Sequence, residues 1–208
     1  MFPSLSTNCE LAMKKTLIRA VALTAALGSV ALAQTTPSDK TAGGAAHPSA
    51  KMTPAQMKMS DERFLKAAYS GNLLEIKLSQ YALEQVKGHE HVRHLAEMMI
   101  KDHEMANKLV TETAQKCGVA LPHDLLPAHK AKLEMAMEVK GEMVHAPYLF
   151  DMAGSHVHTI LCVSHHMHHT QDAAIKNYCA QVLPKIKMHF GMVKPLAEAE
   201  AHVTDMMK

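Results

Sequence analysis

Four polar residues, Glu75, His103, His156 and His189, each interrupt an otherwise apolar stripe of a predicted helix. Every stripe follows the alternating three- and four-residue spacing of positions that a helical bundle buries. Imidazole and carboxylate groups are ligands of Zn, Cu, Ni and Fe in proteins. Because the four residues come from four separate helices, the sequence predicts one transition-metal ion bound in the core of a bundle.

The four residues are also predicted to lie at similar heights along the bundle. At a rise of about 1.5 Å per residue, Glu75 and His103 both lie about 18 to 23 Å from the turn near Gly88. His156 and His189 lie near the middle of the second pair of predicted helices. The four side chains can therefore converge on one point.

Two other interpretations of the same residues remain open. A buried carboxylate needs a partner, and imidazoles that hydrogen bond to Glu75, to one another or to Tyr148 supply one without any ion. A metal-dependent redox enzyme would use the same four residues with one coordination position open. In each case Asp102, His145 and Tyr148 are the residues predicted to lie just behind the four.

The spacing of these residues disfavours several enzyme classes. Di-iron oxidases place a Glu three residues before a His on two helices. Here Ile100, Ala153 and Ile186 occupy that position before the three histidines. The sequence also lacks the signatures of a serine hydrolase, a phosphate-binding loop and a zinc protease. The leading interpretation is metal binding for homeostasis or stress response of the cell envelope, with enzyme activity left open.

Further histidines are dense in two segments of the chain, which holds 16 His in all. These segments contain His89, His91 and His94, and His165, His166, His168 and His169. Such tracts can bind Cu or Zn at an exposed surface. The second tract also has a metal-free explanation, because the helix dipole favours imidazoles near a helix C-terminus.

Cys162 and Cys179 lie at equal distances from the turn near Thr170, on two successive predicted helices. In an oxidising compartment these two cysteines could form a disulfide across the hairpin. Two small buried side chains are the alternative, because neighbouring helices are often too far apart for such a bridge.

Residues 1–33 have the features of a secretory signal peptide. A basic stretch begins at Met13, residues 17–32 are mostly apolar, and Ala31 and Ala33 supply the small residues of a cleavage site. We expect translation to start at Met13 and cleavage to follow Ala33, with an uncleaved anchor as the alternative. The mature protein is then exported, to the periplasm, and no later segment is apolar enough to span a membrane.

The charge balance bears on the choice of partners. The chain carries 22 Lys and Arg and 20 Asp and Glu, for a formal net charge of +2. Cleavage after Ala33 removes three basic residues and Glu10, which leaves a charge close to zero. A nucleic-acid partner is disfavoured because no basic excess is visible. No feature of the sequence indicates a particular protein partner.

One folded domain is predicted between a linker and a short tail. Residues 34–59 are rich in Thr, Pro, Ser, Ala and Gly, a composition typical of a flexible linker. Ser60 is the predicted N-cap of the first helix, because Asp and Glu follow it in the first turn. The domain then covers residues 60–199, and residues 200–208 form a C-terminal tail.

The predicted helices cover residues 61–86, 91–116, 145–168 and 172–199. A crossover over residues 119–144, with a short helix inside it, separates the second helix from the third. Two helical hairpins joined by one long crossover make an all-α, ferritin-like four-helix bundle.

Several motifs resemble one family of proteins. They are Phe64-Leu65-Lys66-Ala67-Ala68, Gly71-Asn72-Leu73-Leu74-Glu75, residues 95–103 ending in Lys101-Asp102-His103, Cys117-Gly118-Val119-Ala120-Leu121-Pro122, and Leu183-Pro184 with His189 five residues on. Together they resemble the exported bacterial ferritin-like family called domain of unknown function 4142, over residues 61–196. The resemblance implies the same bundle, and the family name implies no activity.

The chain departs from that family pattern at two places on the third predicted helix. Val144-His145 stands where relatives have a Phe-Asp pair, and Ser155-His156 stands where they have Asp-His. The His aligned with His156 is thus kept without its acidic neighbour. If that acidic side chain orients a ligand in relatives, another residue must do so here.

Overall fold

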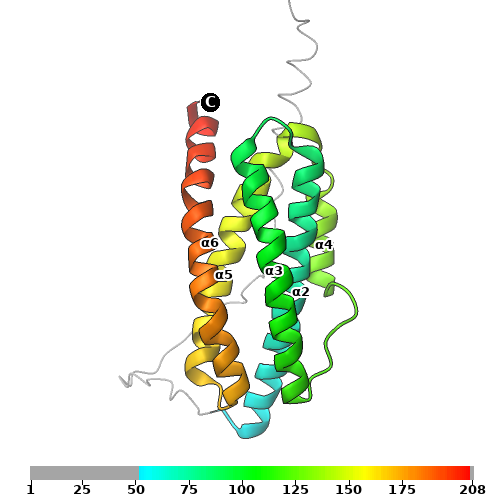
Figure 1. The fold of residues 1–208 in the computed structure, drawn as a ribbon, viewed down its shortest axis with the longest axis vertical. Coiled ribbons are helices and arrows are strands. Elements are labelled where there is room, and N and C mark those ends of the chain that lie inside the picture. The colour runs from blue at the N-terminus through cyan, green and yellow to red at the C-terminus, as the bar shows by residue number, and fades with distance from the viewer. Residues whose placement is uncertain (1–51, 207–208) are drawn as a thin grey trace, which may run out of the picture. The chain divides into compact units, whose positions relative to one another are not determined.

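Four long helices and a crossover form the part of the chain that this computed structural model describes, residues 52–206 (Figure 1). The elements are α2 (Pro54–Gln85), α3 (Glu90–Cys117), α4 (Pro127–Ala136), the 3-10 helix η1 (Gly141–Val144), α5 (His145–His169) and α6 (Ala173–Met206). Helices α2 and α3 form one antiparallel hairpin and α5 and α6 form the other. No strand occurs in the described residues, which confirms the predicted all-α, ferritin-like bundle.

The first helix begins earlier than the sequence analysis predicted. Its N-cap is Thr53, whose hydroxyl accepts a hydrogen bond from the Gln56 backbone N–H, while the Gln56 side chain accepts one from the Thr53 N–H. This capping box, with Pro54 in the first turn, starts the helix at Pro54. The prediction of Ser60 as the N-cap is therefore wrong, and residues 54–59 are helix rather than linker.

The C-terminal end of the domain also differs from the prediction. Helix α6 continues through Pro184 and Pro195 to Met206, so residues 200–206 are helical and do not form a separate tail. The predicted signal peptide, its cleavage site after Ala33 and linker residues 34–51 lie outside the described residues. Within the described part, no helix has both the length and the apolar character needed to cross a membrane.

The ends of the other long helices follow the local sequence closely. Gly118 ends α3 in the left-handed conformation, with φ of 66°, as expected for a glycine C-cap. Asp172 begins α6, because its carboxylate accepts hydrogen bonds from the backbone N–H groups of Ala174 and Ile175 at 2.8 and 3.2 Å. The end of α3 and the start of α6 therefore set the lengths of the hairpins and the level at which their helices face one another.

The crossover lies along α2 and is held there by side chains of that helix. The Ser70 hydroxyl accepts a hydrogen bond from the Leu126 N–H at 2.8 Å, and Tyr81 donates to the Val139 carbonyl at 2.6 Å. Further on, the Gln85 side chain accepts from the N–H of Gly141. The crossover is thus positioned at three heights along one helix.

The apolar core is divided into two clusters. One cluster includes Leu78, Met99 and Leu149 and lies toward the turn between α2 and α3. The other includes Leu65 and Ile175 and lies toward the turn between α5 and α6. On α3, α5 and α6, the predicted polar residue lies between the segments that enter these two clusters, and on α2 Glu75 lies at the start of the segment that enters the first. The bundle therefore contains one polar layer between two apolar ones.

Candidate metal centre

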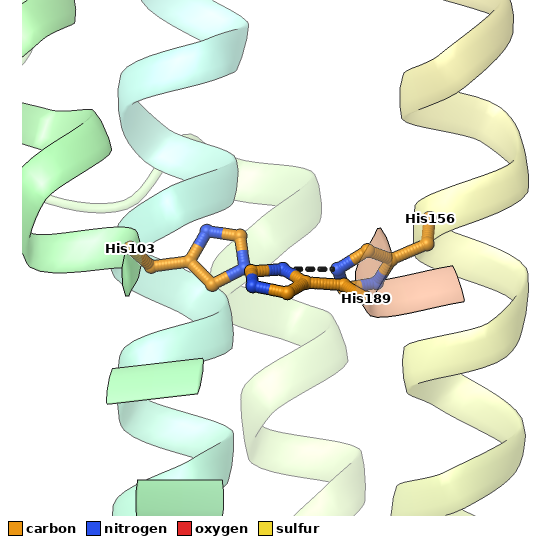
Figure 2. Close-up of side chains that lie close together, drawn as sticks. All are labelled: His103, His156 and His189. Atoms are coloured by element: carbon orange, nitrogen blue, oxygen red, sulfur yellow. Dashed lines mark hydrogen bonds between the residues drawn. The ribbon is translucent and has the colours of Figure 1, made fainter. Parts of the chain in front are cut away.

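The polar layer brings three imidazoles together from three helices. His103 comes from α3, His156 from α5 and His189 from α6, and Figure 2 shows their rings directed toward one another. One nitrogen from each ring lies within 4.8 Å of the other two. All three side chains are buried, with His156 and His189 each only 1% exposed. The convergence predicted from helix heights is therefore present.

Glu75 of α2 completes the group as the fourth residue. Its Oε2 atom lies 2.7 Å from His103 Nε2 and 3.8 Å from His156 Nε2, and the residue is buried. Ligand atoms at about 2.05 Å from a tetrahedral ion lie about 3.3 Å from one another. The two Glu75 distances lie on either side of that value, but the ligand atoms that all lie within 4.8 Å of one another are those of the three histidines alone.

The hydrogen bonds of His156 and His189 fix which ring nitrogens carry hydrogen. Nδ1 of His156 donates to the Met152 carbonyl at 2.8 Å, and Nε2 of His189 donates to the Asp102 carboxylate at 2.8 Å. In the neutral rings, His156 Nε2 and His189 Nδ1 are then lone pairs. These two atoms face each other at 3.2 Å, the dashed line in Figure 2. Two facing lone pairs need a proton or a cation between them.

His103 shows the same arrangement on the other side of the layer. Its Nδ1 lies 2.9 Å from the side-chain oxygen of Asn72, to which it donates, so its Nε2 is the lone pair. That Nε2 and Glu75 Oε2 are 2.7 Å apart, and neither atom has any other partner among the described residues. Buried polar atoms without partners are rare in folded proteins and point to a missing ligand or proton.

The electrostatics keep the donor atoms of His156, His189 and Glu75 deprotonated near neutral pH. Burial lowers the pKa of His189 from 6.5 to about 4, although the hydrogen bond to Asp102 opposes this shift. Burial likewise lowers the pKa of His156. For Glu75, burial raises the pKa, but the surrounding imidazoles, with His103 first, outweigh it and lower the pKa to about 2. Neutral imidazole and ionised carboxylate are the forms that bind metal.

Asp102 holds His189 from behind, as the sequence analysis predicted for a residue next to the four. Its Oδ2 accepts from His189 Nε2 and also lies 3.3 Å from the ammonium of Lys185. Burial raises the pKa of Asp102, but the hydrogen bonds from these two groups outweigh it and lower the pKa. A carboxylate that orients a histidine in this way is the usual support of a metal ligand.

Tyr148 lies near the four residues, whereas His145 does not. The Tyr148 hydroxyl forms a hydrogen bond with Ser79 at 2.9 Å, one turn from Glu75 on α2, and the charge of Glu75 adds to burial in raising the pKa of Tyr148. His145 lies at the first turn of α5, where its Nε2 is 3.1 Å from Glu200, far along the helix from His156. The prediction for His145 is corrected because position on a helix, which the sequence indicates, does not specify the partner on the neighbouring helix.

The surface tract of histidines is spread around the end of α5. His165 and His169 stack on each other with centroids 4.1 Å apart, while His166 turns inward and stacks on Phe64 at 4.0 Å. His168 is exposed. Among the described residues, these four side chains do not gather into a group of three that could hold an ion. Surface metal binding by His165, His166, His168 and His169 stays a prediction.

The predicted disulfide between Cys162 and Cys179 is also corrected, because both are free thiols. Sγ of Cys162 lies 3.4 Å from Nε2 of His158 on the same helix. Cys179 is fully buried in the apolar cluster with Phe64 and Ile175. Equal distance from the turn placed the two residues at one level but did not direct their side chains at each other.

Asn72 and Lys185 belong to the site but were missed. Asn72 lies three residues before Glu75, on the same face of α2, and that spacing could have indicated it. Lys185 lies four residues before His189 on α6, and its side chain is exposed enough to be taken for an ordinary surface residue. Neither contact can be recognised without knowing which helix lies opposite.

A groove gives access to the four residues from outside the bundle. Its volume is about 960 Å³, and α2, α3, α4, α5 and α6 all contribute to its wall. Gly71 and Gly154 belong to the lining, and a Cβ added at Gly154 would meet nothing within 4 Å. An ion or a small molecule can thus reach the polar layer without unfolding of the bundle.

Residues 46–196 match a family model described as Domain of unknown function (DUF4142). The chain belongs to this family. No curated protein matches the chain, and no solved structure does. The DUF4142 match covers the first hairpin, α5, α6 as far as residue 196 and all four residues of the polar layer, and the family description assigns no activity to them.

Proposed function

We propose that this DUF4142 protein binds one transition-metal ion, Zn, Cu, Ni or Fe, through His103, His156, His189 and Glu75. One observation carries the proposal: three imidazole lone pairs and one carboxylate oxygen are directed at each other in a buried layer. The opposite nitrogen of each ring is already fixed by an acceptor. An ion satisfies all four atoms at once.

The charge count supports a cation. Three neutral imidazoles bring no charge, Glu75 brings one negative charge, and Asp102 behind His189 is already paired with the ammonium of Lys185. A cation in the layer offsets the buried charge of Glu75, which is costly if it stays unbalanced. Imidazole and carboxylate ligands suit the borderline ions of the first transition series better than Mg or Ca.

A metal-free layer is the alternative, and it requires two changes. The Asn72 amide would have to turn over, so that its NH₂ donates to His103 and the His103 Nε2–H donates to Glu75. A proton would also have to sit between His156 and His189. Burial opposes that proton because it lowers the pKa of both rings. The metal-bound layer needs neither change.

The biological role that fits this site is metal binding in the cell envelope, for homeostasis or stress response, in a chain exported through its N-terminal signal. The site would then receive its ion after export and hold it without turnover. This part of the proposal rests on residues 1–33 of the sequence. Isolation of the protein from the periplasm with Gln34 as its N-terminal residue would support export, and recovery from the cytoplasm at full length would contradict it.

A second function, metal-dependent redox catalysis, is favoured by the groove, because a small oxidant can reach the layer through it. In that case, the metal-loaded protein should consume peroxide, and a His103→Ala variant should not. If the metal-loaded parent consumes peroxide no faster than free metal does, metal binding remains the proposed function.

The test is metal content, measured by mass spectrometry on the tag-free protein. The comparison is with a triple variant, His103, His156 and His189 to Ala. A matched control removes three exposed histidines instead, His165, His168 and His169. We expect about one equivalent of one metal in the parent and the control and none in the triple variant.

Two results would overturn the proposal: equal metal in all three proteins, or no metal in the parent after growth with each ion supplied. Circular dichroism shows whether the triple variant folds. If it does not, Glu75→Gln keeps the shape of the layer and removes only a charge and a ligand oxygen. Its metal affinity should then fall while its helix content stays the same.

A further inference from the structure

A second group of metal-binding side chains lies at the end of the bundle that carries the C-terminus in Figure 1. Its members are His89, at the turn between α2 and α3, His91, in the first turn of α3, and Glu200, near the end of α6. Each offers one ligand atom, and these atoms lie within 4.8 Å of one another. His91 is exposed, and the other two are half-buried.

The turn that carries His89 is held in place by η1. The Glu142 carboxylate accepts hydrogen bonds from the backbone N–H groups of Lys87 at 2.7 Å and Gly88 at 3.2 Å. These two bonds pull down the pKa of Glu142, so the carboxylate is ionised and the bonds are charge-assisted. The position of His89 thus depends on the crossover as well as on the hairpin.

His145 supports two of the three residues from behind. Its ring stacks on that of His89, with centroids 4.0 Å apart and planes 14° apart. Its Nδ1 lies 2.5 Å from the Glu142 carbonyl and its Nε2 lies 3.1 Å from a carboxylate oxygen of Glu200, and a ring with hydrogen on both nitrogens donates to both. One imidazole therefore orients both a ring and a carboxylate, as residues behind metal ligands do.

We propose that His89, His91 and Glu200 form a second site for one borderline divalent cation, Zn²⁺, Cu²⁺ or Ni²⁺. Two imidazoles and one carboxylate are a ligand set for these ions, and water completes the coordination because His91 faces solvent. The apolar cluster that contains Leu78 and Met99 lies between this site and the polar layer. The two sites therefore bind independently, and the outer one exchanges its ion faster.

An ion at this site would join the last turns of α6 to the turn between α2 and α3. Glu200 lies 109 residues beyond His91 in the chain, so the bond would be a long-range cross-link. Such a cross-link stabilises the end of a helix that otherwise frays. Metal binding should therefore slow hydrogen exchange of the α6 backbone after Lys194.

The experiment is a zinc titration of the tag-free protein in a chelator buffer that sets the free concentration. It is made on the parent, on His91→Ala and Glu200→Gln, and on the control His94→Ala. His94 is an exposed neighbour of His91, and its imidazole lies 3.8 Å from Glu97, outside the group. All four proteins are also titrated with His103, His156 and His189 replaced by Ala.

The parent should bind a second, weaker equivalent that His91→Ala and Glu200→Gln lose and His94→Ala keeps. This equivalent should persist when the three core histidines are absent, which separates the test from that of the polar layer. Zinc should also slow exchange after Lys194 in the parent and not in Glu200→Gln. The same weak binding in His91→Ala as in His94→Ala would overturn the proposal, as would a parent with no second equivalent.

Discussion

The polar layer and the end group use the same two residue types, His and Glu, in different surroundings. In the layer, His103, His156 and His189 are buried, and every ring is fixed by an acceptor on its far side. In the end group, His91 is exposed, and His145 supports His89 and Glu200 from behind. Ligand type determines which ions can bind, whereas burial and outer hydrogen bonds determine how tightly an ion is held.

The two regions also differ in their relation to the family. The matched segment, residues 46–196, includes all four residues of the layer but ends before Glu200. The layer lies inside the part of the chain that defines the DUF4142 domain. The end group needs Glu200, a residue of α6 outside that segment, so the family match does not cover the whole group.

The largest difference should appear when one histidine of each region is removed. With metal at a thousandfold excess over Kd, a bound ion contributes about 4 kcal/mol to the free energy of unfolding. His189→Ala should lose all of this, because it removes a ligand and leaves Asp102 without its buried partner. His91→Ala should change the value by less than about 1 kcal/mol. Urea unfolding with and without metal measures both. If metal stabilised the two variants equally, the claim that the polar layer holds its ion more tightly than the end group would be wrong.

The next largest difference between the two regions should appear in the acid dependence of the stability of the metal-free protein. Burial lowers the pKa of His189 to about 4 in the folded state, against 6.5 unfolded. The unfolded chain therefore binds more protons between these values, so stability falls as the pH drops from 6.5 toward 4. Protonation of this residue should lower the free energy of unfolding by about 3 kcal/mol as the pH falls from 6.5 to 4.

A His189→Gln variant should lack this part of the acid dependence, while Glu200→Gln should retain it. The measurement is the urea midpoint at pH 7, 5.5 and 4.5 in the presence of a chelator. An unchanged slope in His189→Gln would show that other groups cause the acid sensitivity.

Asp102→Asn should have a smaller effect that is confined to the layer. The substitution keeps the shape of the side chain but removes the charge that orients His189. Loss of such a support typically weakens metal affinity about 10- to 100-fold. Competition with a chromophoric chelator measures it, and zinc binding at the end group should be unchanged. Parent-like affinity would mean that the Asp102 hydrogen bond does not orient a ligand.

The smallest effect is expected for Glu142→Gln, which acts on the end group alone. It weakens the charge-assisted hydrogen bonds to the turn that carries His89. The second zinc equivalent should bind about 3- to 10-fold more weakly, with no change at the first. Isothermal titration resolves the two. An effect on the first equivalent would contradict the independence of the two sites.

Much of the fold could be predicted because its signals are local. The boundaries of α3 and α5 follow from helical periodicity and, for α3, from Gly118 at its end. The start of α2 was also encoded locally, in Thr53, Pro54 and Gln56, but Ser60 offered a competing N-cap. The true cap has both halves of a capping box, whereas Ser60 has only acidic neighbours.

The sequence by itself determined that four polar side chains would occupy one level of the bundle. That follows from a single interruption in each apolar stripe and from the fixed rise of a helix. Tertiary structure alone decided which nitrogens of the rings face one another, because the acceptors Asn72 and Asp102 reach them across helices. It also decided that His145 meets Glu200, since periodicity specifies the face of a helix and packing between helices specifies the partner on that face.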